Sequence, residues 1–499
     1  MGIANWRRRR PVVWAGRLAL VLALALVAMT LALAVTPKAS VSVFGQDVEV
    51  GAVAPSPHLG LSGPGQADLF GEGIVATVQH FDGPIRPLIV WQRFNRNDDA
   101  AAFIQSGSDD GRRTVSTGSA EVGRELAAGW TRYFGWLVGA AGLLGGVLYL
   151  VTVGATGLTG KDHRHRSRAV HLSLLGGSVV ASLVVTLGFT ALTVRTAVDQ
   201  LGSVTSLSDL VGTAKLAPIP AAVGPTRADA EVVVIGDSTA AGIGNAPLAK
   251  PTAQDKACQR SSDAYAYSLQ SVAGVTVLNL ACSSATASEG LLGQQVAGGL
   301  TLPPQVGVLQ SVQSASVVVV SVGANDVGWS DFLQYCYGLP RCDDEASDRL
   351  FRSRLDAFKI QYAQLLQQLS DLPAHPRVIV TKYYDPFGSS FDCPALQDPH
   401  ASAGAPPGYG FGPDPGQDNQ DDKIKEKIRP LRVELDRMNT VLEQGAQGFG
   451  FSVVQPRFDG HELCSIEPWV QGMSDPAPFH PKAAGELAIT AAILPQLPG

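Results

Sequence analysis

The sequence is poor in charged residues, and it lacks the signatures of several common binding sites. Charged residues make up 16% of the chain, against roughly 25% in ordinary soluble proteins. The formal net charge is −6, and no basic face is interleaved with aromatic residues, which argues against nucleic-acid binding. A phosphate-binding loop of the Gly-x-x-x-x-Gly-Lys-Ser/Thr type is also missing, which argues against a nucleotide-hydrolysing enzyme.

Metal and dinucleotide motifs are missing as well. No Cys-x-x-Cys pair occurs, and His461-Glu462 lacks the second histidine of a zinc-binding His-Glu-x-x-His helix. Gly242 and Gly244 do not begin a dinucleotide fingerprint, because Pro247 stands where the third glycine belongs. We therefore expect neither a metal nor a cofactor.

Three long apolar segments account for the shortage of charge. They are Leu18–Val35, about Tyr133–Ala155 and about Val170–Val194, and each is long enough to cross a hydrocarbon core of about 30 Å. The second segment has a glycine face that includes Gly142 and Gly145, which allows helices to approach closely in a membrane. We expect all three segments to be transmembrane helices.

Basic residues determine the predicted topology. The basic loop Lys161–Arg168 separates the second and third apolar segments, and the positive-inside rule places this loop in the cytoplasm. The regions flanking the two segments then face outward, whether or not the first segment is cleaved after about Ala39. Retention as a signal anchor is favoured, because Pro37-Lys38-Ala39 is a poor cleavage site. We predict a multi-pass cell-membrane protein whose C-terminal region lies outside.

Cysteine usage agrees with this topology. All six cysteines fall in the region that is predicted to lie outside, at Cys258, Cys282, Cys336, Cys342, Cys393 and Cys464. An oxidising compartment favours disulfide bonds over buried free thiols. Cysteine number alone leaves many pairings open.

The chain divides into five predicted parts. They are a signal anchor (1–36), an extracytoplasmic β-rich segment (37–128), two transmembrane helices with the basic loop (129–195), a linker (196–229) and a C-terminal domain (230–497). The β-rich segment contains short apolar runs such as 74–78 and 88–91, which Gly and Pro residues separate. The prolines of the linker, such as Pro220, disfavour a continuous helix.

The C-terminal domain is predicted to alternate between strands and helices. Strand-like apolar runs occur at 232–235, 275–281, 317–322, 378–381 and 451–454. Helical patterns fall between them, notably at about 346–370 and 421–443. This alternation predicts a parallel sheet with helices on both faces. The Gly- and Pro-rich stretch 386–419 is long for a loop and predicts a functional wall or lid.

Ser238 and His480 are the candidate catalytic pair. Ser238 follows Val232–Gly236, a predicted buried strand that delivers the serine to the carboxyl edge of the sheet. A serine hydroxyl is a weak nucleophile and needs a base within hydrogen-bond reach. Histidine suits this role, because its pKa of about 6.5 lets it accept a proton and later return it. The Gly-x-Ser-x-Gly signature fails, since Ala240 replaces its second glycine.

The C-terminal domain resembles the SGNH (GDSL-type) hydrolases. Three blocks carry the resemblance in the order and spacing of the family: Gly236-Asp237-Ser238, Gly323-Ala324-Asn325-Asp326 and Phe479-His480-Pro481. The resemblance implies a flavodoxin-like three-layer α/β/α hydrolase domain that needs no metal. The cysteine spacing is similar to that of the disulfide-containing actinobacterial secreted lipases, which implies the bonds Cys258–Cys282, Cys336–Cys342 and Cys393–Cys464.

The group that orients His480 departs from the family pattern. In much of the family an aspartate lies three residues before the histidine, but here that residue is Ala477. Asp475 lies five residues before His480 and is one candidate. The other is a backbone carbonyl near residues 476–478, which is the arrangement in lipases that this region resembles.

The resemblance also implies an oxyanion hole. Its donors would be the backbone N–H groups of Ser238 and Ser284 and the side-chain amide of Asn325. Ser284 stands where the family usually has glycine, so a positive φ at this position would strain the backbone by about 1–3 kcal/mol. Asp237 is expected to structure the turn after the strand through hydrogen bonds to nearby backbone groups.

These observations predict a membrane-anchored, extracytoplasmic serine esterase or lipase-like acylhydrolase. Its substrate would be an ester-bearing lipid, glycan or small molecule. One alternative is a cell-envelope acyltransferase or deacylase acting on glycan or lipid hydroxyls, since an acyl-enzyme can pass its acyl group to a hydroxyl other than water. A second alternative is an inactive binding or scaffold module, which the departures at Ala477 and Ser284 favour.

Overall fold

The computed structural model describes residues 3–43, 46–54, 62–69, 75–91, 119–156, 164–201, 229–338, 342–388 and 420–498. The chain forms two compact units. One contains residues 1–68, 74–92 and 110–212, and the other contains residues 213–499 with two short stretches, 69–73 and 93–109. The second unit holds all three sequence blocks of the candidate catalytic site.

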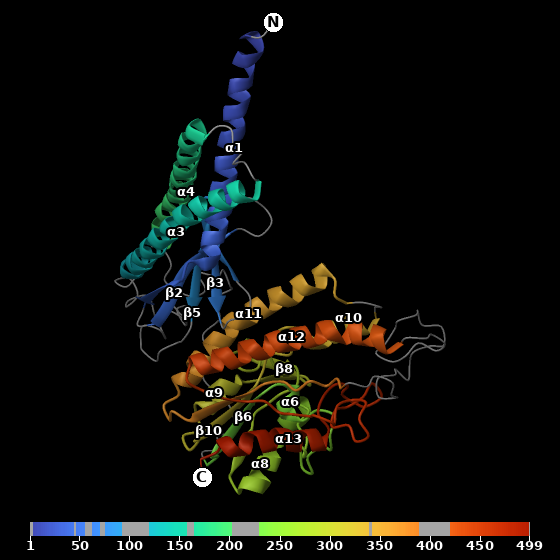
Figure 1. Ribbon diagram of the computed structural model, residues 1–499. Helices are drawn as coiled ribbons and strands as arrows, with labels where there is room; N and C mark the ends of the chain where they lie inside the picture. The colour runs from blue at the N-terminus through green and yellow to red at the C-terminus, as the bar shows by residue number, and fades with distance from the viewer. Residues whose placement is uncertain are drawn as a thin grey trace. The chain divides into compact units, whose positions relative to one another are not determined.

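The N-terminal unit contains three long helices, α1 (Ile3–Val35), α3 (Ser119–Thr156) and α4 (Arg164–Leu201) (Figure 1). Each includes a stretch that is long and apolar enough to cross a membrane, by length and composition: Trp14–Val35, Glu125–Val153 and Val170–Thr196. All three predicted apolar segments therefore lie in helices. Helix α3 begins at Ser119, earlier than the predicted boundary at residue 129.

Glycine brings α3 and α4 close together. A Cβ atom on Gly145 would lie only 2.2 Å from the Ser182 hydroxyl oxygen, and one on Gly142 would lie 2.7 Å from a methyl carbon of Leu183. A Cβ atom on Gly145 would also lie 3.1 Å from the Ser178 backbone oxygen, whereas a Cβ atom on Gly142 would require the Leu183 side chain to move. The glycine face that the sequence indicates is thus the surface of α3 that packs against α4.

The same unit contains a five-stranded sheet. Its strands are β1 (Ala39–Val43), β2 (Gln46–Val53), β3 (Ser62–Leu69), β4 (Val75–Asp82) and β5 (Arg86–Trp91), in the order β1-β2-β5-β3-β4. The pairs β1/β2, β2/β5 and β3/β4 are antiparallel. The Trp130 indole N–H of α3 donates to the Gly51 carbonyl of β2 over 2.9 Å, which fastens this helix to the sheet.

The second unit is built on a five-stranded parallel sheet. Its strands are β6 (Val232–Gly236), β7 (Val277–Asn279), β10 (Val317–Ser321), β11 (Arg377–Thr381) and β12 (Ser452–Val454). Their spatial order is β12-β11-β10-β6-β7, which is the flavodoxin-like order. All five predicted strands are present. The predicted strand at 275–281 is regular only over residues 277–279, although its hydrogen bonds to β6 continue, since the Leu280 N–H donates to the Val234 carbonyl over 2.8 Å and the Cys282 N–H donates to the Gly236 carbonyl over 3.0 Å.

Helices cover both faces of this sheet, as predicted. Helices α11 (Glu345–Ser370) and α12 (Gln420–Gly448) lie on one face, and α8 (Tyr265–Ala273) and α13 (Ala483–Ile493) lie on the other (Figure 1). The central strands are buried: Val233, Val234 and Val318 expose no surface. Such unbroken apolar runs are typical of parallel strands that are covered on both sides.

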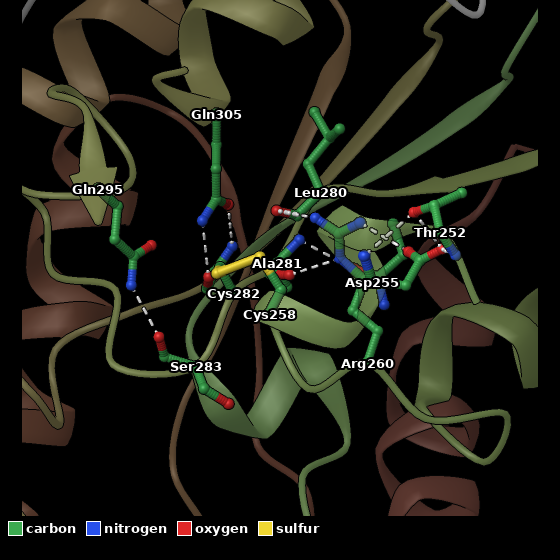
Figure 2. The surroundings of a disulfide bond; sticks show 12 residues. Thr252, Asp255, Cys258, Arg260, Leu280, Ala281, Cys282, Ser283, Gln295 and Gln305 are labelled. Atoms are coloured by element: carbon green, nitrogen blue, oxygen red, sulfur yellow. Dashed lines mark hydrogen bonds and ion pairs between the residues drawn. A yellow bond between two sulfur atoms is a disulfide. The ribbon is translucent and has the colours of Figure 1, made fainter. Parts of the chain in front are cut away.

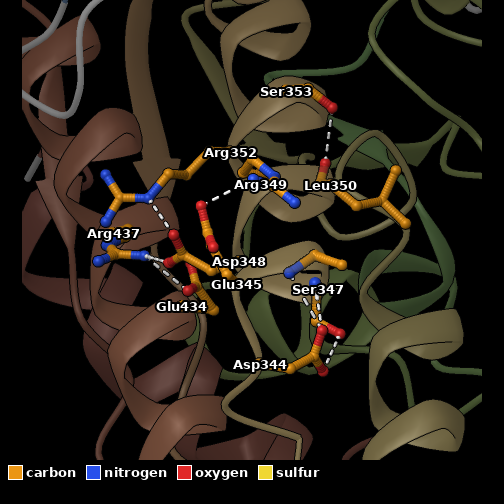
Figure 3. A network of polar contacts seen from close by, with 11 residues as sticks. Asp344, Glu345, Ser347, Asp348, Arg349, Leu350, Arg352, Ser353, Glu434 and Arg437 are labelled. Carbon is orange, nitrogen blue, oxygen red and sulfur yellow. Dashed lines mark hydrogen bonds and ion pairs between the residues drawn. The ribbon is translucent and has the colours of Figure 1, made fainter. Parts of the chain in front are cut away.

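A polar network joins α11 to α12 (Figure 3). The Asp348 carboxylate accepts from Arg352 on its own helix over 2.9 Å and from Arg437 of α12 over 2.8 Å. Arg437 also donates to Glu434 over 2.6 Å. Burial raises the pKa of Glu434 to about 7, and the positive charge of Arg437 opposes this rise. The network holds the two helices of this layer in register.

Shorter elements connect these layers. They are α6 (Ser238–Ala241), α7 (Ala253–Ala257), β8 (Gln295–Ala297), β9 (Leu300–Leu302), α9 (Gln305–Leu309), α10 (Trp329–Gly338) and η3 (Leu494–Gln496). Within the described ranges, two disulfide bonds are formed, Cys258–Cys282 and Cys336–Cys342. The bond implied for Cys393 and most of the predicted lid at 386–419 lie outside the described residues.

Candidate active site

Ser238 lies directly beyond the end of a central strand. Strand β6 ends at Gly236, and Ser238 begins the short helix α6 after the intervening Asp237. Gly236 has a φ of +154°, and a Cβ atom there would lie 2.3 Å from the Ser321 carbonyl oxygen of β10. The Asp237 N–H donates to the same carbonyl over 3.0 Å. The turn that presents Ser238 is therefore built directly on the neighbouring strand.

Asp237 structures this turn, and it is fully buried. One carboxylate oxygen accepts from the Thr239 N–H over 3.0 Å, and the other accepts from the Tyr383 hydroxyl. Burial raises the pKa of Asp237 to about 6, against the effect of these hydrogen bonds. The Tyr383 hydroxyl also accepts from the Ala324 N–H over 3.2 Å. Tyr383 thus ties the first sequence block to the second.

His480 lies beside Ser238. Its Nε2 atom is 2.8 Å from the Ser238 Oγ atom, and its Nδ1 atom is 3.1 Å from the Pro478 carbonyl oxygen. A carbonyl can only accept, so Nδ1 carries the proton and Nε2 is free to accept from the serine hydroxyl. Burial lowers the pKa of His480, and hydrogen bonds to the Pro478 and Ala477 backbone oppose this. The imidazole is therefore uncharged near pH 7.

Asp475 takes a different place. Its carboxylate accepts from the Gly472 N–H over 2.8 Å and forms an ion pair with Lys482 at 3.3 Å. The His480 nitrogen that an aspartate would hold faces the Pro478 carbonyl instead. Of the two orienting groups expected from the sequence, the contacts favour the backbone carbonyl.

Ser284 adopts the left-handed backbone conformation. Its φ is +65°, and its side chain is exposed. The loop that carries it is held by the second sequence block, because the Asn325 side-chain N–H donates to the Ala285 carbonyl over 2.9 Å. Asp326 accepts from the Ala287 N–H over 2.9 Å, and burial raises the pKa of Asp326 to about 7. The expected oxyanion residues Ser284 and Asn325 are thus joined through this loop.

A disulfide bond supports the other side of this loop (Figure 2). Cys282 is bonded to Cys258, and the Ser283 N–H donates to the Cys258 carbonyl over 3.1 Å. The Gln295 side chain donates to the Ser283 carbonyl over 2.7 Å. Arg260 donates to the carbonyls of residues 280 and 281, directly before the disulfide. Backbone and side-chain hydrogen bonds together therefore fix residues 280–283, which lead to Ser284.

A cavity of about 280 Å³ lies beside this disulfide. Its lining includes Arg260, Gln295 and Gln305, but neither Ser238 nor His480. Gln305 exchanges two hydrogen bonds with the Gly236 backbone, at 2.7 and 3.0 Å. Through Gln305 the cavity therefore borders the Gly236 end of β6, and its lining does not include the Ser238–His480 contact.

Aromatic side chains pack against the segment that leads to His480. Phe458 stacks on Tyr384 with the ring centroids 4.2 Å apart, and it meets Trp469 edge-on at 5.8 Å. His461 stacks on Trp469 at 3.8 Å. The Trp469 carbonyl accepts from the Lys482 N–H over 2.7 Å, so this cluster fixes the base of the His480 loop.

Four residues that surround the site lie outside the three sequence blocks, and the blocks do not predict them. They are Asn245, Gln471, Tyr383 and Tyr384, and each donates a side-chain hydrogen bond to a segment that carries Ser238 or His480. The Tyr384 hydroxyl donates to the Phe479 carbonyl over 2.7 Å. Their partners are distant in sequence, so no local motif predicts them.

Comparison with known proteins places this arrangement in a family. The family model for GDSL-like lipases and acylhydrolases matches residues 234–488, slightly more than half of the chain. The chain therefore belongs to the GDSL-like lipase/acylhydrolase family. Members of this family are lipase- or esterase-type acylhydrolases, so the protein is a carboxylic ester hydrolase by class.

Two proteins with similar sequences come from Streptomyces. The chain is 26% identical to Lipase 1 of Streptomyces coelicolor over 271 residues, which cover 52% of this chain and 84% of that protein. It is 28% identical to a lipase of Streptomyces rimosus over 276 residues, with coverages of 53% and 86%. In both cases the match covers about half of this chain and most of the relative.

Two solved structures show similarity of the same extent. The extracellular lipase from Streptomyces rimosus has a TM-score of 0.39 at 20% identity and covers 52% of this chain and 98% of its own. Phospholipase A1 from Streptomyces albidoflavus has a TM-score of 0.37 at 21% identity, with coverages of 54% and 100%.

Proposed function

We propose that the protein is a membrane-anchored, extracytoplasmic serine esterase with lipase-like activity, in which Ser238 and His480 form the catalytic dyad. The observation that carries the proposal is the 2.8 Å contact between Ser238 Oγ and His480 Nε2, with the opposite ring nitrogen on the Pro478 carbonyl. This arrangement leaves Nε2 as the acceptor for the serine proton. It supplies the two groups that acyl transfer requires.

The reaction would proceed in two halves. Ser238 Oγ attacks the ester carbonyl carbon while its proton passes to His480 Nε2, and the carbonyl oxygen becomes an oxyanion. The tetrahedral intermediate then expels the alcohol, which takes the proton back from His480. Water attacks the resulting acyl-enzyme through the same base and releases the carboxylic acid.

The oxyanion would be stabilised by three donors. They are the backbone N–H groups of Ser238 and Ser284 and the Asn325 side chain. Asn325 uses one amide N–H to hold the Ala285 carbonyl, and its second N–H is left for the oxyanion. A preorganised donor of this kind contributes about 3–4 kcal/mol to transition-state stabilisation.

Among the described residues, His480 Nδ1 meets the Pro478 carbonyl and no carboxylate, and this has an energetic consequence. The Pro478 carbonyl fixes the same tautomer that an aspartate would, but it is uncharged and stabilises the imidazolium less. The proposed enzyme therefore depends on accurate placement of the imidazole and on the oxyanion donors.

The location of the enzyme is part of the proposal. Three helices of spanning length and composition, together with the basic stretch 161–168, support anchoring with the C-terminal unit outside. The disulfide bonds Cys258–Cys282 and Cys336–Cys342 agree with an oxidising compartment. The names of the Streptomyces relatives support an ester-bearing lipid as the substrate class.

Fluorophosphonate labelling of the full chain, purified in detergent micelles, tests the dyad. Wild type should be labelled at Ser238, Ser238→Ala should not be labelled, and His480→Ala should react about 10²–10⁴-fold more slowly. Hydrolysis of p-nitrophenyl esters should follow the same order. Equal labelling of wild type and Ser238→Ala would show that the nucleophile assignment is wrong.

A second measurement tests the location. Protease added to intact spheroplasts of expressing cells should digest the C-terminal unit, because it lies outside. Digestion only after the membrane is broken would contradict the proposed topology. In the p-nitrophenyl ester assay, an added alcohol acceptor distinguishes hydrolysis from acyl transfer, since transfer yields a new ester.

A further inference from the structure

The hydrogen bond that orients the His480 ring does not place the ring against Ser238. Its acceptor, the Pro478 carbonyl, lies only two residues earlier in the same loop. That bond fixes the ring relative to its own loop, whose residues 477–481 form no helix or strand. Some other contact must therefore fix this loop relative to the segment that carries Ser238.

Gln471 makes this connection. It is only 2% exposed, and its side-chain amide spans the two segments. The amide nitrogen donates to the Ile243 carbonyl over 2.8 Å and to the Pro481 carbonyl over 3.1 Å. The amide oxygen accepts from the Ala477 N–H over 3.1 Å. All the hydrogen-bonding groups of this side chain are thus used to join the histidine loop to the segment after the serine.

The backbone of Gln471 pairs with the same loop. Its N–H donates to the His480 carbonyl over 2.8 Å, and its carbonyl accepts from the Phe479 N–H over 2.8 Å. Phe479 has a φ of +66°, a conformation that costs free energy for a non-glycine residue. The surrounding hydrogen bonds hold His480 in place despite this strain.

Asn245 completes the connection from the serine side. Its side-chain nitrogen donates to the Gly242 carbonyl over 3.1 Å and to the Pro481 carbonyl over 3.0 Å. Gly244 leaves room for Gln471, because a Cβ atom at this position would lie 2.2 Å from the Gln471 amide oxygen. We call the pair Gln471 and Asn245 the amide clamp.

We propose that Gln471 is a positioning residue for the reaction: the amide clamp holds the His480 imidazole against Ser238 and takes over the placing role that a triad carboxylate would have. The inference rests on the dyad proposed above. It explains how a histidine without a carboxylate partner keeps its 2.8 Å contact with the serine. The carboxylate's placing role is then carried by neutral amides that never touch the ring.

The test is the substitution Gln471→Met in the full chain, which keeps the length of the side chain and removes its three hydrogen bonds. We expect kcat for a p-nitrophenyl ester to fall by about 10²-fold, because a displacement of about 1 Å at the reacting groups has this effect. KM should stay within about twofold, since the clamp does not contact substrate. Fluorophosphonate labelling should slow by the same factor as kcat.

A matched control separates positioning from a general loss of stability. Gln367 in α11 is also 2% exposed, and its amide nitrogen donates to Asp371 over 2.9 Å. Gln367→Met therefore removes a buried amide far from the site in sequence and should leave kcat unchanged. If Gln471→Met and Gln367→Met lower the melting temperature alike and both keep wild-type kcat, the proposal is overturned.

A double-mutant cycle gives the readout that a purely structural role would not move. If Gln471 acts through the imidazole, Gln471→Met should have no further effect on the residual activity of His480→Ala. An undiminished additional loss in that background would overturn the proposal. Should Gln471→Met fail to fold, Asn245→Ala provides a milder variant, because Asn245 is partly exposed. We expect kcat of Asn245→Ala to fall by about tenfold. An unchanged kcat in this variant would contradict the clamp.

The proposed dyad is checked in the same series. If Ser238→Ala kept wild-type activity, the dyad itself would be wrong. If Ser238→Ala were inactive while both clamp variants kept wild-type kcat, only the clamp would be wrong.

Discussion

The serine half and the histidine half of the candidate site are built in different ways. Ser238 follows β6 after a single residue, Asp237, whose N–H donates to the backbone of β10. His480 lies in a loop without regular structure, which side-chain amides and a tyrosine hydroxyl hold in place. A regular sheet positions the proposed nucleophile, whereas single buried polar groups position the proposed base. Point substitutions should therefore perturb the second half more selectively than the first.

Two consecutive tyrosines connect these halves to the same strand. Tyr383 and Tyr384 follow β11 (Arg377–Thr381), and both are largely buried. The Tyr383 hydroxyl donates to Asp237 beside the serine, and the Tyr384 hydroxyl donates to the Phe479 carbonyl beside the histidine. Removing each hydroxyl in turn tests the comparison directly.

Tyr383→Phe should have the largest effect on stability. The substitution leaves the buried Asp237 carboxylate without one of its donors, which costs about 1–3 kcal/mol of unfolding free energy. Because the tyrosine hydrogen bond lowers the pKa of Asp237, that pKa should rise further in the variant. Denaturant unfolding of the purified full chain measures the loss. The control is Tyr362→Phe, because the Tyr362 hydroxyl donates to a neutral group, the Leu442 carbonyl. An equal loss of unfolding free energy in both variants would contradict the importance of the Tyr383 hydrogen bond to Asp237.

Tyr384→Phe should affect the histidine half with a smaller loss of stability. The Phe479 carbonyl loses a neutral donor, which costs about 0.5–1.5 kcal/mol. If loss of this hydrogen bond raises the activation free energy of the reaction by about 1 kcal/mol, kcat falls by roughly fivefold. Steady-state kinetics at constant temperature measures the change. An unchanged kcat would show that the histidine loop does not depend on this hydroxyl.

Ser284→Gly should stabilise the protein. The serine occupies a φ of +65°, which destabilises the folded state by about 1–3 kcal/mol. Glycine relieves this strain, but its greater conformational entropy in the unfolded chain lowers the free energy of unfolding by about 0.5–1 kcal/mol. We expect a net gain of about 1 kcal/mol in unfolding free energy with kcat little changed. Ser288 in the same loop is half-buried and has no positive φ, so it offers a control, since Ser288→Gly gains nothing from relief of strain. A loss of stability in Ser284→Gly would contradict the strain argument.

The pH dependence should reveal the missing carboxylate. Burial lowers the pKa of His480, and only the neutral ring can accept the serine proton, so kcat/KM should rise with pH through a pKa below about 6.5 and stay flat above it. A midpoint above about 7 would indicate an anionic partner instead. Burial also raises the pKa of Asp237 to about 6 and the pKa of Asp326 to about 7, so the assignment to His480 requires that Asp237→Asn and Asp326→Asn each keep the same acidic limb.

Asp475→Asn should have the smallest effect. Its ion pair with Lys482 is partly exposed, and such pairs contribute about 0–1 kcal/mol. Asparagine also keeps an acceptor for the Gly472 N–H. We expect kcat to change by less than about threefold. In hydrolases with a Ser-His-Asp triad, by contrast, replacing the aspartate that contacts the histidine reduces kcat by about 10⁴-fold. A loss of that size would show that Asp475 contacts the imidazole during turnover.

Much of the scaffold follows from local sequence patterns. The apolar runs at 232–235 and 317–322 predict β6 and β10, because a short unbroken apolar run is typical of a buried parallel strand. The long apolar segments predict α1, α3 and α4, since their length and lack of charge need no tertiary information. Asp237 is likewise predictable as a turn residue, because its partner Thr239 is only two residues away.

The sequence by itself determined the order of strands and helices and the apolar segments, and it indicated Ser238 and His480 as the candidate pair, because these depend on local patterns of residues that are neighbours in the chain. Only the tertiary structure decided that the Pro478 carbonyl holds the histidine ring, that Ser284 has a positive φ, and that Gln471 meets Ile243. The last contact joins residues 228 positions apart. Such contacts depend on how whole layers pack, and no local pattern encodes them.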